Sequence, residues 1–430
     1  MLTGIVLVLY HYTLFFSFMS SDLPENCQKS VFFCLLLRIS AYWCGFAAFV
    51  WFSVLLLASM TVLQAQDMAP PPPTVDTIPP LQSPSNGIKT PPKPYKMKAY
   101  GAPLIFKTPE TNFGFGVAGG LTFKINKTDT TQRPSNVLLN LDYTLNKQMI
   151  LEVGYTIFFK HENYQLRLHN SYKKYPDSFW GIGPNTVDSL EERYSYNRWD
   201  IYPSFQRRIH DRLFIGLRYR YLGLFSVDWK EGGLYEEADF LGRDGGFMSG
   251  IGYMINWDSR DLFFNPSKGF YAHLVNLFYP RWMGGQYNNT HFEIDTRFYW
   301  NVVPKYRHVL AMRIFGRFNF GKNVPFFHTA LIGGSEVMRG YFNGRFRDKH
   351  ALTTTLEYRF PIWWRFGAAA FIAAGDVAPT IKAFNLRSLK YSVGGGLRFM
   401  IDKRERINVR LDVGHGGGNT EFYITASESF

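Results

Sequence analysis

Cysteine is scarce in this chain, and none occurs after residue 44. The three thiols, Cys27, Cys34 and Cys44, all lie within the first 50 of 430 residues. If that region is removed on export, as its pattern below predicts, the rest of the chain can form no disulfide. Cysteine chemistry therefore gives no indication of function.

Signatures of enzymes and of metal or nucleotide sites are also missing. No Gly-x-Ser-x-Gly elbow occurs, and Gln165 stands where a zinc motif beginning at His161 would need its second histidine. The run Gly114-x-Gly116-x-x-Gly119 has the spacing of a dinucleotide fingerprint, but it lies inside a strand pattern instead of opening a helix. These absences argue against an enzyme, and we expect no catalytic residue, no metal and no cofactor.

Acidic residues are the minority, with 34 against 47 basic ones and a net charge of +13. A soluble protein with that excess can bind nucleic acid. Here the basic residues alternate with aromatic ones along strand patterns and do not form a cluster. Anionic lipid head groups or a charged lumen are better partners, and we expect no nucleic acid.

The N-terminal region, residues 1–65, resembles a secretory signal. Residues 41–63 carry no charge, follow Lys29 and Arg38, and lead to a small residue, Ala65, at the expected cleavage point. An apolar run of this length could also span a membrane as a helix, so that alternative stays open. A second apolar stretch at the very start suggests that the start codon is misplaced.

A proline-rich segment follows at residues 66–97. It lacks the apolar residues for a core and predicts a semi-rigid periplasmic linker. The segment is too short for a globular domain.

Residues 98–430 show a period of two throughout, which predicts strands. Aromatic residues make up 18% of the chain, and the apolar faces belong to strands of about ten residues, the length that crosses a bilayer at a tilt. Short and long connections alternate, as they do in outer-membrane barrels. We therefore predict an all-β fold, a transmembrane antiparallel β-barrel of about sixteen strands. The predicted strands are roughly 99–107, 112–124, 136–145, 148–159, 161–173, 194–208, 211–228, 245–258, 268–280, 288–301, 305–320, 351–361, 365–375, 390–401, 405–415 and 420–430.

The loop 321–350 carries the most distinctive motif. Its central residues are Gly333, Gly334, Met338, Arg339, Gly340 and Tyr341. Gly340 lets the backbone turn where a Cβ would clash, so that Arg339 can project a planar charged fork. Such a tip suits a polar cavity lined by carboxylates.

Several motifs together resemble the BamA/TamA-like outer-membrane barrels, the bacterial surface antigen family. Besides Met338-Arg339-Gly340-Tyr341, they are Asp258-x-Arg260-Asp261 with Pro266-x-x-Gly269, Leu356 to Pro361, and Thr108 to Thr111. The resemblance covers about residues 99–430. It implies that the loop folds into the barrel lumen, and that this chain is a short member without the family's N-terminal periplasmic domains.

The resemblance also implies carboxylate partners for Arg339. Glu357 is the first candidate. The second partner normally occupies a Phe-x-Asp-x-Gly segment, but Ala373 holds the aspartate's place here, so Asp376 and Asp412 are the other candidates. A terminal aromatic strand, with Phe422 and Ile424 on the face of Phe430, resembles the signal read by the barrel-assembly machinery; Glu428 breaks that face.

The function implied by the resemblance is insertion, assembly or translocation of outer-membrane proteins through a lateral seam. Gly101 and Pro103 in the first strand predict weak pairing there. Two alternatives stay open: a solute or lipid conduit gated by the 321–350 loop, and an accessory or structural barrel in a larger complex. The expected location is the outer membrane of a Gram-negative cell. The expected partners are outer-membrane lipid, lipopolysaccharide, and client or accessory outer-membrane proteins.

Overall fold

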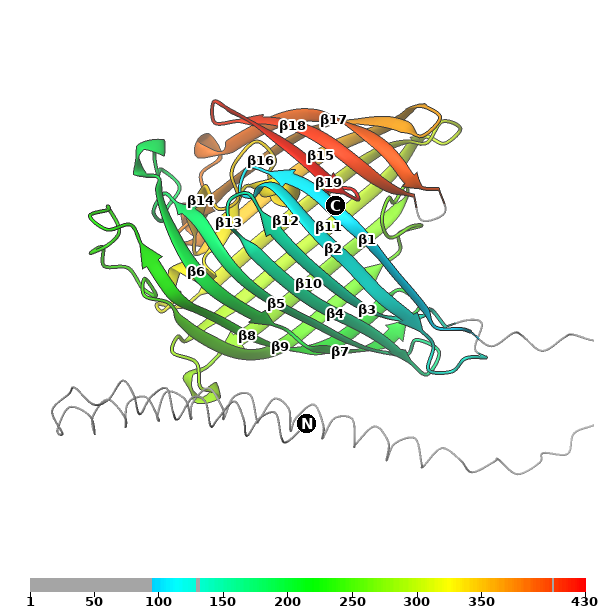
Figure 1. Cartoon of the computed structure of the whole chain (residues 1–430), viewed down its shortest axis with the longest axis horizontal. Helices are drawn as coiled ribbons and strands as arrows, with labels where there is room; N and C mark the ends of the chain where they lie inside the picture. The colour runs from blue at the N-terminus through cyan, green and yellow to red at the C-terminus, as the bar shows by residue number, and fades with distance from the viewer. Residues whose placement is uncertain (1–94, 129–131, 404–405) are drawn as a thin grey trace, which may run out of the picture. The chain divides into compact units, whose positions relative to one another are not determined.

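The computed structural model describes residues 95–128, 132–403 and 406–430 (Figure 1). The predicted leader, residues 1–65, and nearly all of the predicted linker lie outside the described residues. The wall strands are β1 (Lys98–Thr108), β2 (Asn112–Phe123), β3 (Ser135–Thr144), β4 (Met149–Phe159), β5 (Tyr164–Phe179), β6 (Glu192–Ile201), β7 (Ser204–His210), β8 (Leu213–Trp229), β9 (Gly246–Asp258), β10 (Gly269–Tyr279), β11 (Asn289–Val303), β12 (His308–Phe320), β15 (His350–Trp363), β16 (Phe366–Ala378), β17 (Lys390–Asp402), β18 (Ile407–Gly416) and β19 (Asn419–Ala426).

These segments form a closed antiparallel barrel with sixteen strand positions, as predicted. Neighbours in sequence pair all the way around, and β1 pairs with β19 to close the ring. Both β6 and β7 lie between β5 and β8, so they are two halves of one strand, separated at Tyr202 and Pro203. Proline has no N–H to donate, which accounts for an interruption at this position.

Side chains alternate between the lumen and the outside. On β12, Val309, Ala311 and Arg313 are buried on the inner face, while Leu310 and Met312 are half-buried on the outer face. On β3, Leu141 and Tyr143 are exposed on the outer face and Asp142 is buried between them. An apolar exterior around a charged interior fits a barrel surrounded by lipid. Within the described residues, no helix is long and apolar enough to cross a bilayer.

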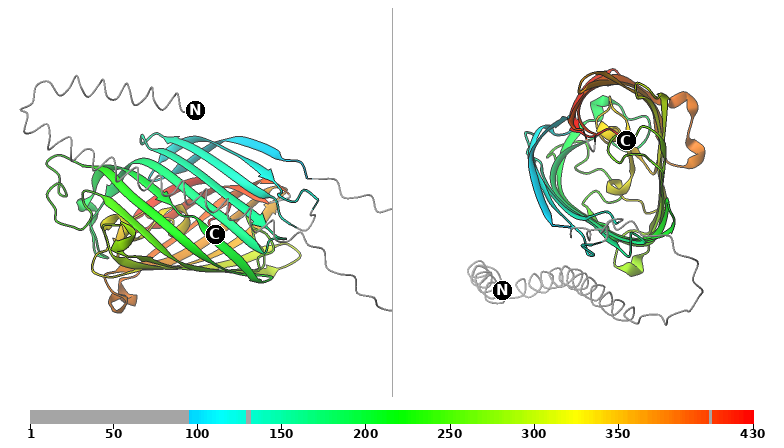
Figure 2. Two further views of the ribbon diagram at one scale, coloured as in Figure 1. Left: turned by 90° about the horizontal axis from the view of Figure 1, so that it is seen from below. Right: turned by 90° about the vertical axis from the view of Figure 1, so that its right-hand side faces the viewer.

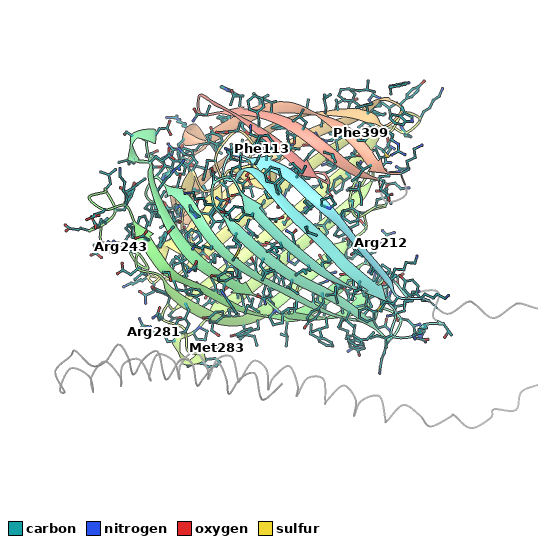
Figure 3. All side chains as sticks on the ribbon, viewed as in Figure 1. Phe113, Arg212, Arg243, Arg281, Met283 and Phe399 are labelled. Atoms are coloured by element: carbon teal, nitrogen blue, oxygen red, sulfur yellow. The ribbon has the colours of Figure 1, made fainter. Side chains whose placement is uncertain are left out.

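The two ends of the barrel differ in their connections. We call the end with the long connections the loop rim; its segments include 180–191, 230–245, 280–288, 321–349 and 379–389. We call the other end the turn rim; its connections include the short turns 160–163, 211–212, 304–307 and 364–365, and the longer segment 259–268. Figure 3 labels Arg212 on the turn rim and Arg243 and Arg281 on the loop rim, at opposite ends of the barrel.

An aromatic cluster fills the lumen beneath the loop rim. We call it the loop-rim cluster; it is centred on Phe179, Tyr194, Trp229, Phe240 and Phe326. The ring centroids of Tyr194 and Trp229 lie 4.6 Å apart and those of Phe179 and Phe326 lie 5.7 Å apart. These rings come from wall strands and from two loops, 230–245 and 321–349, so the two loops share one packed core. The loop rim also carries the short 3₁₀ turns η1 (Asp188–Leu190), η2 (Arg281–Met283), η3 (Phe326–His328), η4 (Ile381–Ala383) and η5 (Leu386–Ser388).

The connection between β12 and β15 folds into the lumen. It contains β13 (Ala330–Ile332), the single turn α3 (Gly334–Val337) and β14 (Phe346–Asp348). Figure 2 shows this yellow segment inside the ring when the barrel is viewed from its end. We refer to residues 321–349 as the lumen loop.

One strand prediction was wrong in its last residues. The final strand ends at Ala426, and Ser427 turns the chain with a φ of 65°. Phe430 therefore does not share an outer face with Phe422 and Ile424. It is buried inside the barrel against Tyr299, Val309 and Ala311.

Candidate functional site

The tip of the lumen loop is built on glycines with positive φ. Gly333, Gly334 and Gly340 have φ values of 113°, 82° and 103°. At Gly340 a Cβ would also lie 2.9 Å from the backbone carbon of His415 on β18. Side chains are disfavoured at such angles, and glycine lets the loop approach the wall closely. The N–H of Gly334 donates to the carbonyl of Tyr341 at 2.9 Å and closes the turn.

Arg339 projects from this tip into a buried site. Only 2% of its surface is exposed, and Glu357 and Asp412 are fully buried. Its Nη1 donates to Oδ2 of Asp412 at 2.7 Å, and its Nη2 donates to Oε2 of Glu357. Its guanidinium lies 3.4 Å from the ring centre of Phe371. The structure thus brings together Arg339 and two of the three candidate carboxylates.

The third candidate, Asp376, is not a partner of Arg339, which corrects that prediction. Lumen-facing positions on β16 are odd-numbered, such as Phe371 and Ala373, whereas Asp376 lies on the other parity at the loop rim. There it binds Nζ of Lys390 at 2.5 Å and Oγ of Ser388 at 2.9 Å. Ala373, which occupies the family's aspartate position, packs with Met338 and Tyr341 in an apolar cluster.

Arg339 belongs to a larger charged network that the sequence analysis missed. Glu357 also accepts from Nε of Arg359 at 2.6 Å, and Asp412 accepts from Arg398 and, at 2.9 Å, from Nη1 of Arg410. Arg398 and Asn408 bind Glu428 at 2.9 Å and 2.6 Å. Four buried arginines thus share three buried carboxylates: Arg339, Arg359, Arg398 and Arg410 with Glu357, Asp412 and Glu428. The inward parity of these positions on β15, β17 and β18 was the available signal for the arginines.

Residues 427–430 turn into the lumen and join this network. The Oγ of Ser429 donates to the carbonyl of Ser335 in the lumen loop at 3.1 Å. The carbonyl of Phe430 accepts from Nη2 of Arg359 at 2.9 Å. The segment after β19 therefore connects β19 to the lumen loop and to the wall strands β11, β12 and β15.

The seam between β1 and β19 is joined by very little backbone pairing. Within the described residues, the two strands share one register pair, Lys107 with Ile424, whereas β1 and β2 share eleven, from Lys98–Thr122 to Thr108–Asn112. Residues 98–103 of β1 are exposed on both faces. Most of the edge of β1 therefore has no strand beside it.

The lumen loop contacts both sides of this seam. On the β19 side, the N–H of Gly340 donates to the hydroxyl of Tyr423 at 2.9 Å. On the β1 side, the N–H of Asn343 donates to Oε1 of Glu110, in the turn between β1 and β2, at 2.5 Å. The loop bridges two strands that hardly pair with each other.

A sixteen-stranded antiparallel barrel, with a long loop held inside it by a buried arginine, defines a BamA-like outer-membrane barrel protein. The Omp85 superfamily domain matches residues 112–401, and the chain belongs to that superfamily. This family of outer-membrane barrels is the one that the sequence motifs predicted.

Solved structures of the same fold are distant in sequence. BamA from Haemophilus ducreyi lacking POTRA domains 1–3 has a TM-score of 0.53 at 12% identity, covering 77% of this chain and 70% of that one. CdiB from Escherichia coli has a TM-score of 0.52 at 8% identity, covering 77% and 62%. CdiB from Acinetobacter baumannii has a TM-score of 0.50 at 10% identity, covering 78% and 60%. The chain thus spans about three fifths of the length of the two CdiB chains. No curated protein sequence gives a significant match.

Proposed function

We propose that this barrel acts in the insertion, assembly or translocation of other outer-membrane proteins, and that it does so at the seam between β1 and β19. The observation that carries the proposal is the single register pair, Lys107 with Ile424, that joins the two strands. An unpaired strand edge presents N–H and C=O groups that another strand can pair with. The first strand of this barrel is such an edge over most of its length.

The lumen loop supports the same role. Because Gly340 binds Tyr423 and Asn343 binds Glu110, contacts outside the ladder hold the seam. Side-chain contacts of this kind can break without unpairing a row of backbone hydrogen bonds. A client strand could therefore enter while the other fifteen junctions stay paired.

We place the barrel in the outer membrane of a Gram-negative cell, with the loop rim facing outward and the turn rim facing the periplasm. Outer-membrane lipid and lipopolysaccharide would then surround the apolar exterior. The clients would be outer-membrane proteins, and the role requires no catalytic residue.

A conduit gated by the lumen loop is the second candidate. Two chambers lined by charged and polar residues, of about 360 and 350 Å³, lie in the lumen. The loop-rim cluster and the lumen loop would have to move before a solute could pass between the rims. The seam needs only its few lumen-loop contacts to break, with the loop-rim cluster left in place, so we favour the lateral role.

A disulfide across the seam tests the proposal. Lys107→Cys with Ile424→Cys places two thiols at directly paired positions, where Cα separations suit a disulfide. Leu411→Cys with Ile424→Cys is the matched control, because these residues pair within the β18–β19 junction. Assembly of client barrels in reconstituted vesicles should stop when the seam is oxidised and recover on reduction, while the control pair should have no effect. Full assembly activity with the seam locked would contradict the lateral role; ion conductance that persists with the seam locked and without client assembly would favour the conduit.

A further inference from the structure

Two arginines that have no acidic partner among the described residues lie in one row on the inner wall. Arg167 on β5 is paired in register with Ser204 on β7, and Ser204 is paired with Arg218 on β8. The next residue in the row, on β9, is Gly252. Neighbouring strands are about 4.8 Å apart, so the two arginine backbones are about 10 Å apart with a small side chain between them.

The carboxylates near this row are already paired with other arginines. Asp200 accepts from Arg220 at 2.7 Å and from Arg198 at 3.1 Å. Glu293 accepts from Arg317 at 2.7 Å. Among the described residues, no carboxylate lies within ion-pair distance of Arg167 or Arg218. Both arginines are half-buried. A positive charge that is partly removed from water and has no counter-charge is costly, so an anion at this position would be stabilising.

Further polar groups in the same region have no partner within the described chain. Gln206 is fully buried, and neither its amide oxygen nor its amide nitrogen is bonded. It is paired in register with Gln165 on β5, which accepts from Nη2 of Arg167 at 2.9 Å. The Nε atoms of both arginines and Nδ1 of His273 are also buried and unbonded.

Arg218 and His273 line a chamber in the lumen, and Arg167 and Gln206 lie on the strands beside it. It has a volume of about 360 Å³, and its lining includes Arg218, Arg220, His273, Glu293 and Arg317. With Arg198 and Asp200, which complete its charged lining, the chamber holds four arginines and two carboxylates. The arginines thus exceed the carboxylates by two charges, with the histidines counted as neutral.

We propose that this part of the lumen wall is a binding site for a phosphate-bearing anion, with Arg218 as the main ligand and Arg167 and His273 beside it. The arginine fork donates two parallel hydrogen bonds to a phosphate, which suits a guanidinium with no carboxylate of its own. The amide of Gln206 supplies a neutral donor at the same wall. The anion is either free phosphate or the head group of a phospholipid. The site is separate from the Arg339 network and does not depend on the lateral seam.

Titration calorimetry on the purified full-length mature protein in dodecyl maltoside tests the site, at constant ionic strength in chloride. One arm uses inorganic phosphate, and the other uses dihexanoyl phosphatidic acid. We expect saturable binding in at least one arm. Saturation by inorganic phosphate assigns the free anion, and saturation by the lipid analogue alone assigns a head group. Absence of saturation in both arms would overturn the proposal.

Substitutions separate binding from folding. Arg218→Gln should weaken binding about tenfold or more, the usual effect of losing a charged hydrogen bond. It should leave the thermal unfolding temperature equal or higher, because a half-buried charge without a counter-charge is removed. Arg207→Gln is the matched control, since Arg207 follows Gln206 on β7 and is exposed on the outer face; it should bind as the parent does. If Arg218→Gln does not fold, Arg167→Gln replaces it with the same expectation. Unchanged affinity in the folded variant would overturn the proposal.

Discussion

Asn343 in the lumen loop donates its backbone N–H to Oε1 of Glu110, in the turn between β1 and β2, at 2.5 Å. The two residues are 233 positions apart in sequence. The carbonyl of Glu110 also accepts from Asn146 and Gln148 at 2.7 and 2.9 Å. Glu110 therefore attaches the first hairpin of the barrel to the lumen loop and to the next hairpin.

Replacing Glu110 by Gln should change how stability depends on pH. Burial raises the pKa of the Glu110 carboxyl, and the hydrogen bonds from Thr108 and Asn343 offset this only in part. The folded state therefore favours the protonated carboxyl, and stability falls as pH rises from the unfolded value near 4.5 through the raised folded pKa. Glutamine keeps the acceptor and never ionises. Thermal unfolding of Glu110→Gln in detergent should thus occur above the parent's temperature at pH 8 and match it at pH 4.

Glu231→Gln is the control for loss of a surface charge, because Glu231 is exposed on the same loop rim. It should show no difference that depends on pH. A Glu110→Gln protein that is less stable than the parent at pH 8 would show that the ionised carboxylate is needed for the loop contact.

Arg339 and Asp412 should be strongly coupled, and so should Arg339 and Glu357. A double-mutant cycle with Arg339→Ala and Asp412→Ala should give a coupling free energy of about 1–3 kcal/mol, because each single change leaves a buried charge without its partner. Urea unfolding, followed by heat-modifiable gel mobility, measures it. A cycle of Arg339 with Glu162, which is bound to Arg133 at the turn rim, should be additive. Additive free energies in the first cycle would show that the contact between Arg339 and Asp412 does not stabilise the fold.

Phe430 should contribute to stability from inside the barrel. Phe430→Ala should lower the free energy of unfolding by up to about 3 kcal/mol, the low end for a buried phenylalanine, because residues 427–430 can detach without unfolding the wall. Phe422→Ala, at an exposed outer position, is the control and should cost less in detergent. Equal effects would contradict the lumen position of Phe430.

The mature protein should begin near Gln66. The leader lies outside the described residues, so this remains a prediction from the sequence. Mass spectrometry of the chain extracted from membranes measures it directly. A mature chain that retains Cys44 would show that the apolar segment is a membrane anchor.

The period of two predicted most of the wall strands, because successive side chains in each strand face the lipid and the lumen in turn. The contact of Arg339 with Glu357 could be predicted because the resemblance to the BamA/TamA-like barrels implies a carboxylate partner for the loop arginine. The path of residues 427–430 could not, because a strand pattern does not reveal where the chain leaves the wall. Glu428 looked like a fault in an outward apolar face. It lies inside with Arg398, and its charge was the sign that the chain turns inward.

The sequence predicted weak pairing at the seam, but not that a single register pair would join β1 and β19. Gly101 and Pro103 indicate weak pairing of the first strand. The stagger that leaves one register pair depends on the positions of all the other strands around the ring. The sequence of the first and last strands therefore does not predict how many register pairs join them.

The loop-rim cluster has a consequence for motion. A barrel in lipid has its apolar side chains outside, so most of its wall lacks the water-excluding interior of a soluble protein. The packed rings of Phe179, Trp229, Phe240 and Phe326 give two loops, 230–245 and 321–349, such an interior. Because they share it, these loops should exchange their amide hydrogens as one cooperative unit, with an opening free energy distinct from that of the wall. The loops that share the loop-rim cluster would then open together, while each short turn at the turn rim fluctuates independently.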